Sequence, residues 1–170
     1  SHAVSILTAE VYELHDRAKV EVFAFSWSND DGSPLRARVV AAMDHYIRVD
    51  HMNDEQAARL IRSHEIDILV DLKGHTEGSA PSVLALRPAP IQVHYLGYPG
   101  TLGGGLVDYL VGDAIVTPPA HAGDYAETLV TLPHTYQVND RTRAIAEAPT
   151  RQSLGFTRDG GMVLSELVPG

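Results

Sequence analysis

One stretch limits the possible folds of this chain more than any other, because prolines stand before a short apolar segment and glycines and a further proline follow it. Pro88 and Pro90 fix φ and remove backbone N–H donors, so a strand can form only after them, over residues 91–96. The Gly- and Pro-containing residues 97–100 then end this strand in a stiff loop. Ligands of open α/β sheets bind at such loops, beyond the carboxyl ends of the strands. The sequence therefore indicates a candidate ligand loop at 97–100, with a plain tight turn as the alternative.

Strand and helix patterns alternate along the rest of the chain. Apolar residues at three- and four-residue spacing predict a helix over 3–14, and continuous apolar runs predict strands covered on both faces over 20–26 and 66–72. Further helices are predicted over 34–43, 54–62 and 82–86, and further strands over 45–49, 107–111 and 129–132. Ser33 and Asp54 are expected to cap the helices that follow them. This alternation predicts an α/β fold, with a doubly wound, mostly parallel sheet.

Length and charge restrict the classes of protein to consider. The 170 residues, 44% of them hydrophobic, suffice for one domain and not for two lobes. A formal net charge of −9 argues against nucleic acid and anionic membrane surfaces as partners. No run of about 18 apolar residues and no signal-peptide pattern occurs, so a cytoplasmic protein is the default expectation. The chain starts with Ser1 and enters a helical pattern almost at once, so we expect it to be part of a longer protein.

The sequence gives little support for a metal or a redox cofactor. It has nine histidines and no cysteine, and none of the histidines stands in a His-Glu-x-x-His array. The acidic pair Asp30-Asp31 is followed by Gly32 and lacks the intervening residue of the aspartate pair that binds metal in other sugar transferases. The Gly-x-Gly-x-x-Gly fingerprint of dinucleotide enzymes is absent too. We therefore expect no metal site and no cofactor.

The central loop and its flanks resemble the signature of the O-linked N-acetylglucosaminyltransferase (SPINDLY-like) family. The resemblance is carried by the runs Arg-Pro-Ala-Pro-Ile-Gln at 87–92 and Tyr-Leu-Gly-Tyr-Pro-Gly-Thr at 95–101, and it continues through 30–32, 66–78, 108–109, 118–119 and 132–140. It implies that residues 1–145 form the Rossmann-like amino-terminal lobe of a GT-B glycosyltransferase. Residues 146–170 would then be a linker and the start of the carboxyl-terminal lobe.

The same resemblance implies an activity. Members of this family transfer N-acetylglucosamine from UDP-N-acetylglucosamine to serine and threonine hydroxyls of proteins, and many carry upstream tetratricopeptide repeats that recruit the protein acceptors. Two alternatives stay open. A non-catalytic relative could keep the lobe as a protein-binding surface, and related bacterial enzymes of the same fold use UDP-glucose and asparagine acceptors. In the family, donor identity is determined largely by the other lobe, so this lobe alone does not discriminate between the donors or between the acceptors.

The resemblance points to His2 as the catalytic residue. In the family, a histidine followed within three residues by serine or threonine opens the first helix and lines the active site, and His2 with Ser5 matches this pattern. The positive end of a helix disfavours imidazolium, so a neutral imidazole would be available to accept the proton of an attacking hydroxyl. Positioning of the substrates is an alternative role for His2, and a frayed terminus is the alternative without function.

Three further residues are expected to bind the substrates. Leu96 and Gly97 match family positions beside the donor sugar, where a residue without Cβ would admit the sugar ring and a leucine would exclude water. A core position is the alternative for Leu96. Thr76 lies in the loop after the preceding strand, at the same edge of the sheet. His75 and Glu77 depart from the family pattern, and we assign no role to them.

We predict that His2→Ala in the full-length protein lowers sugar transfer by at least about tenfold, the low end of what loss of a positioned base costs. Release of UDP in the presence of an acceptor protein measures the rate, and circular dichroism checks that the variant is folded. Unchanged turnover would remove His2 from the site.

Overall fold

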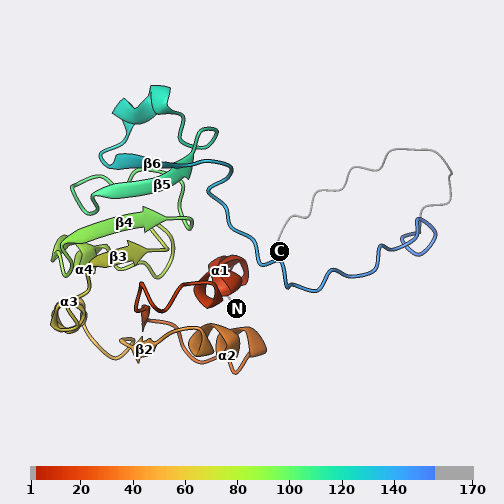
Figure 1. The fold of residues 1–170 in the computed structure, drawn as a ribbon, viewed down its shortest axis with the longest axis horizontal. Coiled ribbons are helices and arrows are strands. Elements are labelled where there is room, and N and C mark those ends of the chain that lie inside the picture. Colours follow the sequence, from red (N-terminus) through yellow and green to blue (C-terminus); the bar gives the residue numbers. More distant parts are fainter. Residues whose placement is uncertain (1–2, 156–170) are drawn as a thin grey trace.

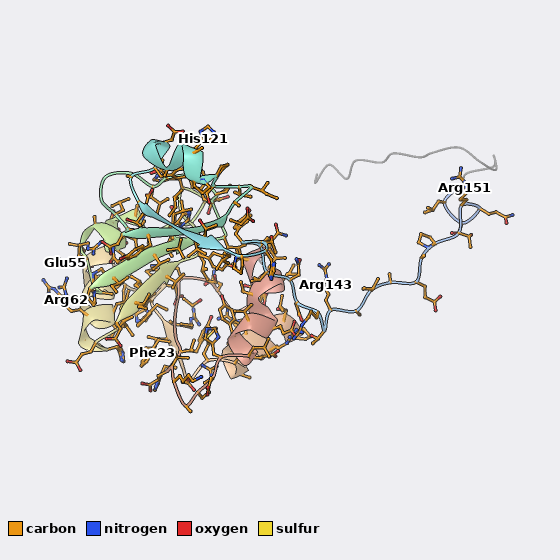
Figure 2. All side chains as sticks on the ribbon, turned by 45° about the horizontal axis from the view of Figure 1, so that its top comes forward. Phe23, Glu55, Arg62, His121, Arg143 and Arg151 are labelled. Atoms are coloured by element: carbon orange, nitrogen blue, oxygen red, sulfur yellow. The ribbon has the colours of Figure 1, made fainter. Side chains whose placement is uncertain are left out.

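The computed structural model describes residues 3–155 and shows a body of parallel strands and helices followed by an extended segment (Figure 1). After β6 the chain passes α1 and then leaves the body. Figure 2 shows Arg151 on this outer segment, away from the packed side chains of the body. Within residues 3–155, no helix has the length and apolar character needed to cross a membrane.

The first half of the chain forms a two-stranded parallel sheet. Strand β1 (Phe23–Ser26) pairs with β2 (His45–Arg48), and helix α2 (Pro34–Ala41) connects them. Ser33 caps α2 as predicted, because its side chain accepts a hydrogen bond from the backbone N–H of Arg36. Helix α1 (Ala3–Glu13) packs against α2. These elements confirm the predicted order, although β1 begins later than the apolar pattern indicated.

The second half forms a four-stranded parallel sheet in the order β3-β4-β5-β6. The strands are β3 (Ile68–Asp71), β4 (Ile91–Tyr95), β5 (Tyr109–Asp113) and β6 (Thr128–Leu132), with α4 (Pro81–Ala85) before β4 and the short helix η1 (Pro119–Asp124) before β6. The predicted α/β fold with parallel strands is therefore confirmed, but the strands form two sheets and not one. The arrowheads of β3, β4 and β5 point the same way in Figure 1, so their carboxyl ends share one edge.

Helix α3 (Asp54–Ser63) is capped by Asn53. Asp54, which the sequence predicted as the cap, is instead the first residue of the helix. The Asn53 side chain accepts a hydrogen bond of 2.9 Å from the backbone N–H of Gln56, and the Gln56 side chain accepts one of 3.0 Å from the backbone N–H of Asn53. This capping box satisfies two N–H groups at once. Asp54 lies in the first turn, where its negative charge still favours the helix terminus.

The larger of two hydrophobic core clusters among the described residues joins the two sheets. Its buried members come from α3, from α4 and from the residue that follows β2: Ala57, Ala58, Ile61, Val83 and Val49. Phe25 of β1 and Leu69 of β3 pack against this cluster from the two sheets. The prediction that Ala57, Ala58 and Ile61 form the inner face of α3 is thus confirmed.

The prediction that the strand at 66–72 is covered on both faces is wrong. Leu69 packs into the core, but on the opposite face of β3 the side chains of Ile68 and Val70 are 55% and 44% exposed. The exposed apolar face continues across the sheet with Ile91, Tyr109 and Val130. Successive side chains of a strand point to opposite faces, and α3 and α4 pack against only one of them.

We predict that Asn53→Ala lowers the free energy of unfolding by about 1 kcal/mol, because it removes the side-chain cap of α3. Asp54→Ala serves as the matched control and is expected to cost a few tenths of a kcal/mol, the usual size of an exposed charge–dipole contribution. Urea unfolding of both variants measures the difference. A larger loss for Asp54→Ala would show that the cap had been assigned to the wrong residue.

Candidate functional site

Two loops meet at the carboxyl edge of the four-stranded sheet: the β3 loop (residues 72–80) and the β4 loop (residues 96–105). Their backbones touch at Gly97. A Cβ added to Gly97 would overlap the carbonyl oxygen of Leu72 and lie 2.9 Å from the carbonyl carbon. Real Cβ atoms do not approach backbone so closely, so only glycine fits at this position without a shift of the β3 loop.

This contact corrects the reason given for glycine at 97. The sequence predicted that the absent Cβ leaves room for a sugar ring, but the backbone of Leu72 fills that room. Glycine is needed here for the approach of the two loops. A place for Gly97 beside the donor sugar stays a prediction, and in that case the residue would present its backbone to the ligand.

Leu96 adopts a backbone conformation that is rare for a residue with a side chain, with φ at 73°. Such a left-handed conformation costs roughly 1–3 kcal/mol and persists only when the surroundings enforce it. The side chain of Leu96 is only 9% exposed, as expected both for a core position and for the wall of a ligand site. Strain of this kind gathers at functional sites, which favours the second interpretation.

Beneath these loops lies a buried pair that the sequence analysis missed, His94 of β4 and Asp71 of β3. The Nδ1 atom of His94 lies 3.0 Å from Oδ2 of Asp71, and its Nε2 atom bonds the carbonyl oxygen of Tyr98 in the β4 loop. Asp71 also accepts hydrogen bonds from the backbone N–H groups of Lys73 and Gly74, at 3.2 and 2.7 Å. The pair therefore contacts both loops at once.

The two members of the pair shift each other's proton affinity. Burial by itself would raise the pKa of Asp71, but the hydrogen bonds from His94, Gly74 and Lys73 outweigh it and the pKa falls below its usual value. Burial by itself would lower the pKa of His94, but Asp71 and the Tyr98 carbonyl raise it above its usual value. Both pKa shifts favour an ion pair between an ionised Asp71 and a protonated His94.

The signal that could have revealed this pair is a register relationship. Asp71 and His94 are polar residues inside apolar strands, and in the sheet they stand directly opposite each other. Finding them from the sequence requires knowing that β3 and β4 are neighbours and how they align, because the two residues belong to separate stretches of the chain.

Thr76 lies in the β3 loop as predicted, and its hydroxyl has a structural partner. Its Oγ1 donates a hydrogen bond of 2.9 Å to the carbonyl oxygen of Lys73, and its own carbonyl accepts one from the backbone N–H of Ser79. The hydroxyl oxygen keeps lone pairs that could accept a hydrogen bond from a ligand. Its predicted role in binding substrate stays a prediction.

His75 joins the β3 loop to the far end of the β4 loop. Its Nε2 atom lies 3.1 Å from the carbonyl oxygen of Leu102, and its ring meets that of Tyr98 edge-on, with centroids 5.6 Å apart. The backbone N–H groups of Leu102 and Gly103 in turn donate to Oε1 of the buried Glu127, at 2.8 and 3.2 Å. The β4 loop is thus held at both ends.

A second aspartate organises the neighbouring loops in the same way as Asp71. Asp113 ends β5 and accepts hydrogen bonds of 2.8 Å from the backbone N–H groups of Ile115, Val116 and Tyr136. These bonds, that from Val116 first, lower the pKa of Asp113. The hydroxyl of Tyr95 donates to the carbonyl of Tyr136 at 2.6 Å, which ties the chain after β6 to β4.

The predicted catalytic residue, His2, lies outside the described residues. The helix that follows it is anchored to the chain after β6, because Arg141 donates from its side chain and its backbone N–H to Glu10 of α1, at 2.6 to 2.9 Å. A shallow pocket of about 370 Å³ lies between α1 and α2 and is lined in part by Arg38 and Asp140. Residues 3–155 hold no group of three or more His, Asp or Glu side chains that could bind a metal ion.

The chain is similar to a family of known glycosyltransferases. The family model of Glycosyl transferase family 41 matches residues 1–162. The chain is 41% identical over 140 residues to the probable UDP-N-acetylglucosamine–peptide N-acetylglucosaminyltransferase SEC of Arabidopsis thaliana, and the match covers 82% of the chain and 14% of that protein. It is 35% identical over 146 residues to the UDP-N-acetylglucosamine–peptide N-acetylglucosaminyltransferase of Caenorhabditis elegans, covering 85% of the chain and 13% of that protein.

A solved structure of an O-GlcNAc transferase is similar to this chain as well. A mutant of the Thermobaculum terrenum O-GlcNAc transferase matches with a TM-score of 0.76 and 37% sequence identity, over 80% of this chain and 26% of that one. The chain therefore spans about a quarter of this structure and a smaller share of the two sequence relatives.

We predict that Gly97→Ala lowers the free energy of unfolding by roughly 1–3 kcal/mol, because the new Cβ would force the backbones of the two loops apart. Gly123→Ala is the matched control: nothing lies within 4 Å of its Cβ position, so stability should change little. Urea unfolding of the two variants provides the comparison. Equal stability of Gly97→Ala and the parent protein would contradict the close approach of the loops.

Proposed function

We propose that this chain, which belongs to glycosyl transferase family 41, forms the amino-terminal lobe of an enzyme that transfers N-acetylglucosamine from UDP-N-acetylglucosamine to serine and threonine hydroxyls of proteins. The observation that carries the proposal is the match to an O-GlcNAc transferase structure, at 37% identity and a TM-score of 0.76. The names of the two sequence relatives support the donor and the peptide acceptor.

In the proposed reaction, the acceptor hydroxyl oxygen attacks the anomeric carbon of the sugar, the bond from that carbon to the UDP oxygen breaks, and the hydroxyl proton passes to a base. We assign the base to His2. Holding donor and acceptor together can lower the barrier by about 7–11 kcal/mol. This lobe would supply one wall of the cleft in which both are held, with the remaining contacts made by parts of the protein beyond this chain.

The β3 and β4 loops suit the role of that wall because hydrogen bonds and a close backbone contact already hold them against each other without a ligand. Leu96 would shield the sugar from water, Gly97 would offer its backbone, and Thr76 would accept a hydrogen bond. Their mutual contacts mean that little conformational freedom is lost when a ligand binds. A cytoplasmic location and tetratricopeptide repeats upstream belong to the same proposal and rest on the family resemblance.

The donor and the acceptor can be tested together with the full-length protein. We expect UDP release with UDP-N-acetylglucosamine and a serine- or threonine-containing peptide to exceed that with UDP-glucose by at least about tenfold, since a site built for the N-acetyl group leaves polar groups unpaired without it. The matched control peptide has alanine at the acceptor position. Preference for UDP-glucose and asparagine would favour the related N-glycosyltransferase activity, and no turnover with either donor would favour a non-catalytic relative.

A further inference from the structure

We propose that His94 is a positioning residue for sugar transfer: held as an imidazolium between the Asp71 carboxylate and the Tyr98 carbonyl, it fixes the β4 loop against the β3 loop. The inference rests on the proposed function only in assigning these loops to the sugar site. The arrangement of the loops themselves is independent of it.

The protonation state follows from the partners of the ring. The His94 side chain is 1% exposed, so neither ring nitrogen can turn to water for a partner. Nδ1 faces a carboxylate oxygen at 3.0 Å, and Nε2 faces the backbone carbonyl of Tyr98. An ionised carboxylate and a carbonyl only accept hydrogen bonds, and a neutral imidazole has a single N–H to donate. Both bonds can form only if the ring carries two protons and a positive charge.

Asp71 is held in its ionised form by the start of the β3 loop. Its two oxygens accept hydrogen bonds from the backbone N–H groups of Lys73 and Gly74, at 3.2 and 2.7 Å, in addition to the bond from His94. A carboxylate with several such donors keeps its charge. The imidazolium therefore has a fixed counter-ion that is itself part of the turn leading into the β3 loop.

The ring contacts the carbonyl of Tyr98, two residues after the strained Leu96 of the β4 loop. Leu96, with φ at 73°, lies between His94 and Tyr98 in the chain. The same region has no spare room, because a Cβ on Gly74 would lie 2.7 Å from both the His94 ring and the Cβ of Tyr98. The charge-assisted bond to the Tyr98 carbonyl thus helps to offset the strain at Leu96.

The pH dependence of this arrangement has a definite sign. Asp71 is the charged group that faces the ring from β3, while the Lys73 ammonium turns to the carbonyl of Glu77 and His75 lies across the ring of Tyr98. The pKa of His94 is raised in the folded protein. Its stabilising contribution is therefore fully present below the ordinary histidine pKa and is lost as the pH rises through the raised value. Loss of the proton leaves two acceptors facing one N–H, and the β4 loop is released.

The test uses the full-length protein and hydrogen exchange of the β4 loop, followed by mass spectrometry from about pH 6 to 9 and corrected for intrinsic exchange rates. In the parent protein we expect protection of residues 96–102 to fall by about tenfold as the pH rises through the pKa of His94. Asp71→Asn keeps the shape of the side chain that faces His94 and removes its charge. The pKa of His94 should therefore drop, and the fall in loop protection should occur at lower pH. The alkaline limb of the pH profile of kcat/KM for sugar transfer should move with it.

A matched control comes from a second histidine–carboxylate pair, which lies in the first half of the chain and is exposed to solvent. His45 of β2 lies 2.7 Å from Oε1 of Glu21, and both side chains are exposed. Glu21→Gln should leave the protection of the β4 loop and the pH profile unchanged. In addition, ring ¹⁵N chemical shifts of His94 should be those of an imidazolium at neutral pH in the parent protein.

A neutral ring at pH 7, or the same pH dependence of loop protection in the parent and in Asp71→Asn, would overturn the assignment. Hydrogen exchange also separates this inference from the proposed function, because it needs no turnover. A protein that shifts loop protection as expected but transfers no sugar would support the role of His94 in holding the loop and would contradict the proposed activity. A protein that transfers sugar but shows pH-independent loop protection would support the proposed activity and contradict the role of His94 in holding the loop.

Discussion

The backbone contact between Leu72 and Gly97 is the constraint on which the rest of the carboxyl edge depends. Side chains normally hold neighbouring loops several ångströms apart, but none stands between these two residues. The carbonyl of Leu72 occupies the place of a Cβ at Gly97, while the missing Cβ of Gly74 makes room for the side chains of His94 and Tyr98. Because the loops meet through backbone at this point, a displacement of one loop also displaces the other.

Carboxylates at strand ends give this edge its shape. Asp71 ends β3 and Asp113 ends β5, and each gathers backbone N–H groups from the chain that follows. Turn-forming aspartates of this kind direct the chain out of a strand through local bonds. Each aspartate also reaches a more distant segment, Asp71 through His94 and Asp113 through Tyr136. Local turn chemistry and long-range order are therefore supplied by the same side chains.

Much of the fold follows from local patterns in the sequence. The Pro88 and Pro90 boundary, the inner face of α3 and the order of strands and helices are consequences of proline geometry and hydrophobic periodicity, which need no knowledge of distant contacts. The cap of α3 was misplaced by one residue because Asn53 and Asp54 can both act as caps and only Asn53 completes a capping box with Gln56. The exposed face of β3 could not be foreseen, since the apolar pattern does not tell what covers each side.

The candidate site was predicted less well, for a physical reason. Leu96 and Gly97 were predicted from a family signature that is continuous in the sequence, and Thr76 from its place in the loop after the preceding strand. The pair of His94 and Asp71 is separated by 23 positions and exists only through the register of two strands. The space beside Gly97 was misjudged for the same reason, because its occupant belongs to another loop.

Strand pairing among residues 3–155 stays within each of the two sheets, and side-chain packing around α3 is what joins them. Packing contacts fall off steeply when surfaces separate, so this joint depends on close apolar contact. Ion pairs add a second link, because Glu10 of α1 and Arg38 of α2 bind Arg141 and Asp140 in the chain that follows β6. That chain is tied to β4 by the bond between Tyr95 and Tyr136, so the first fifty residues are coupled to the carboxyl edge by electrostatic contacts as well as by apolar packing.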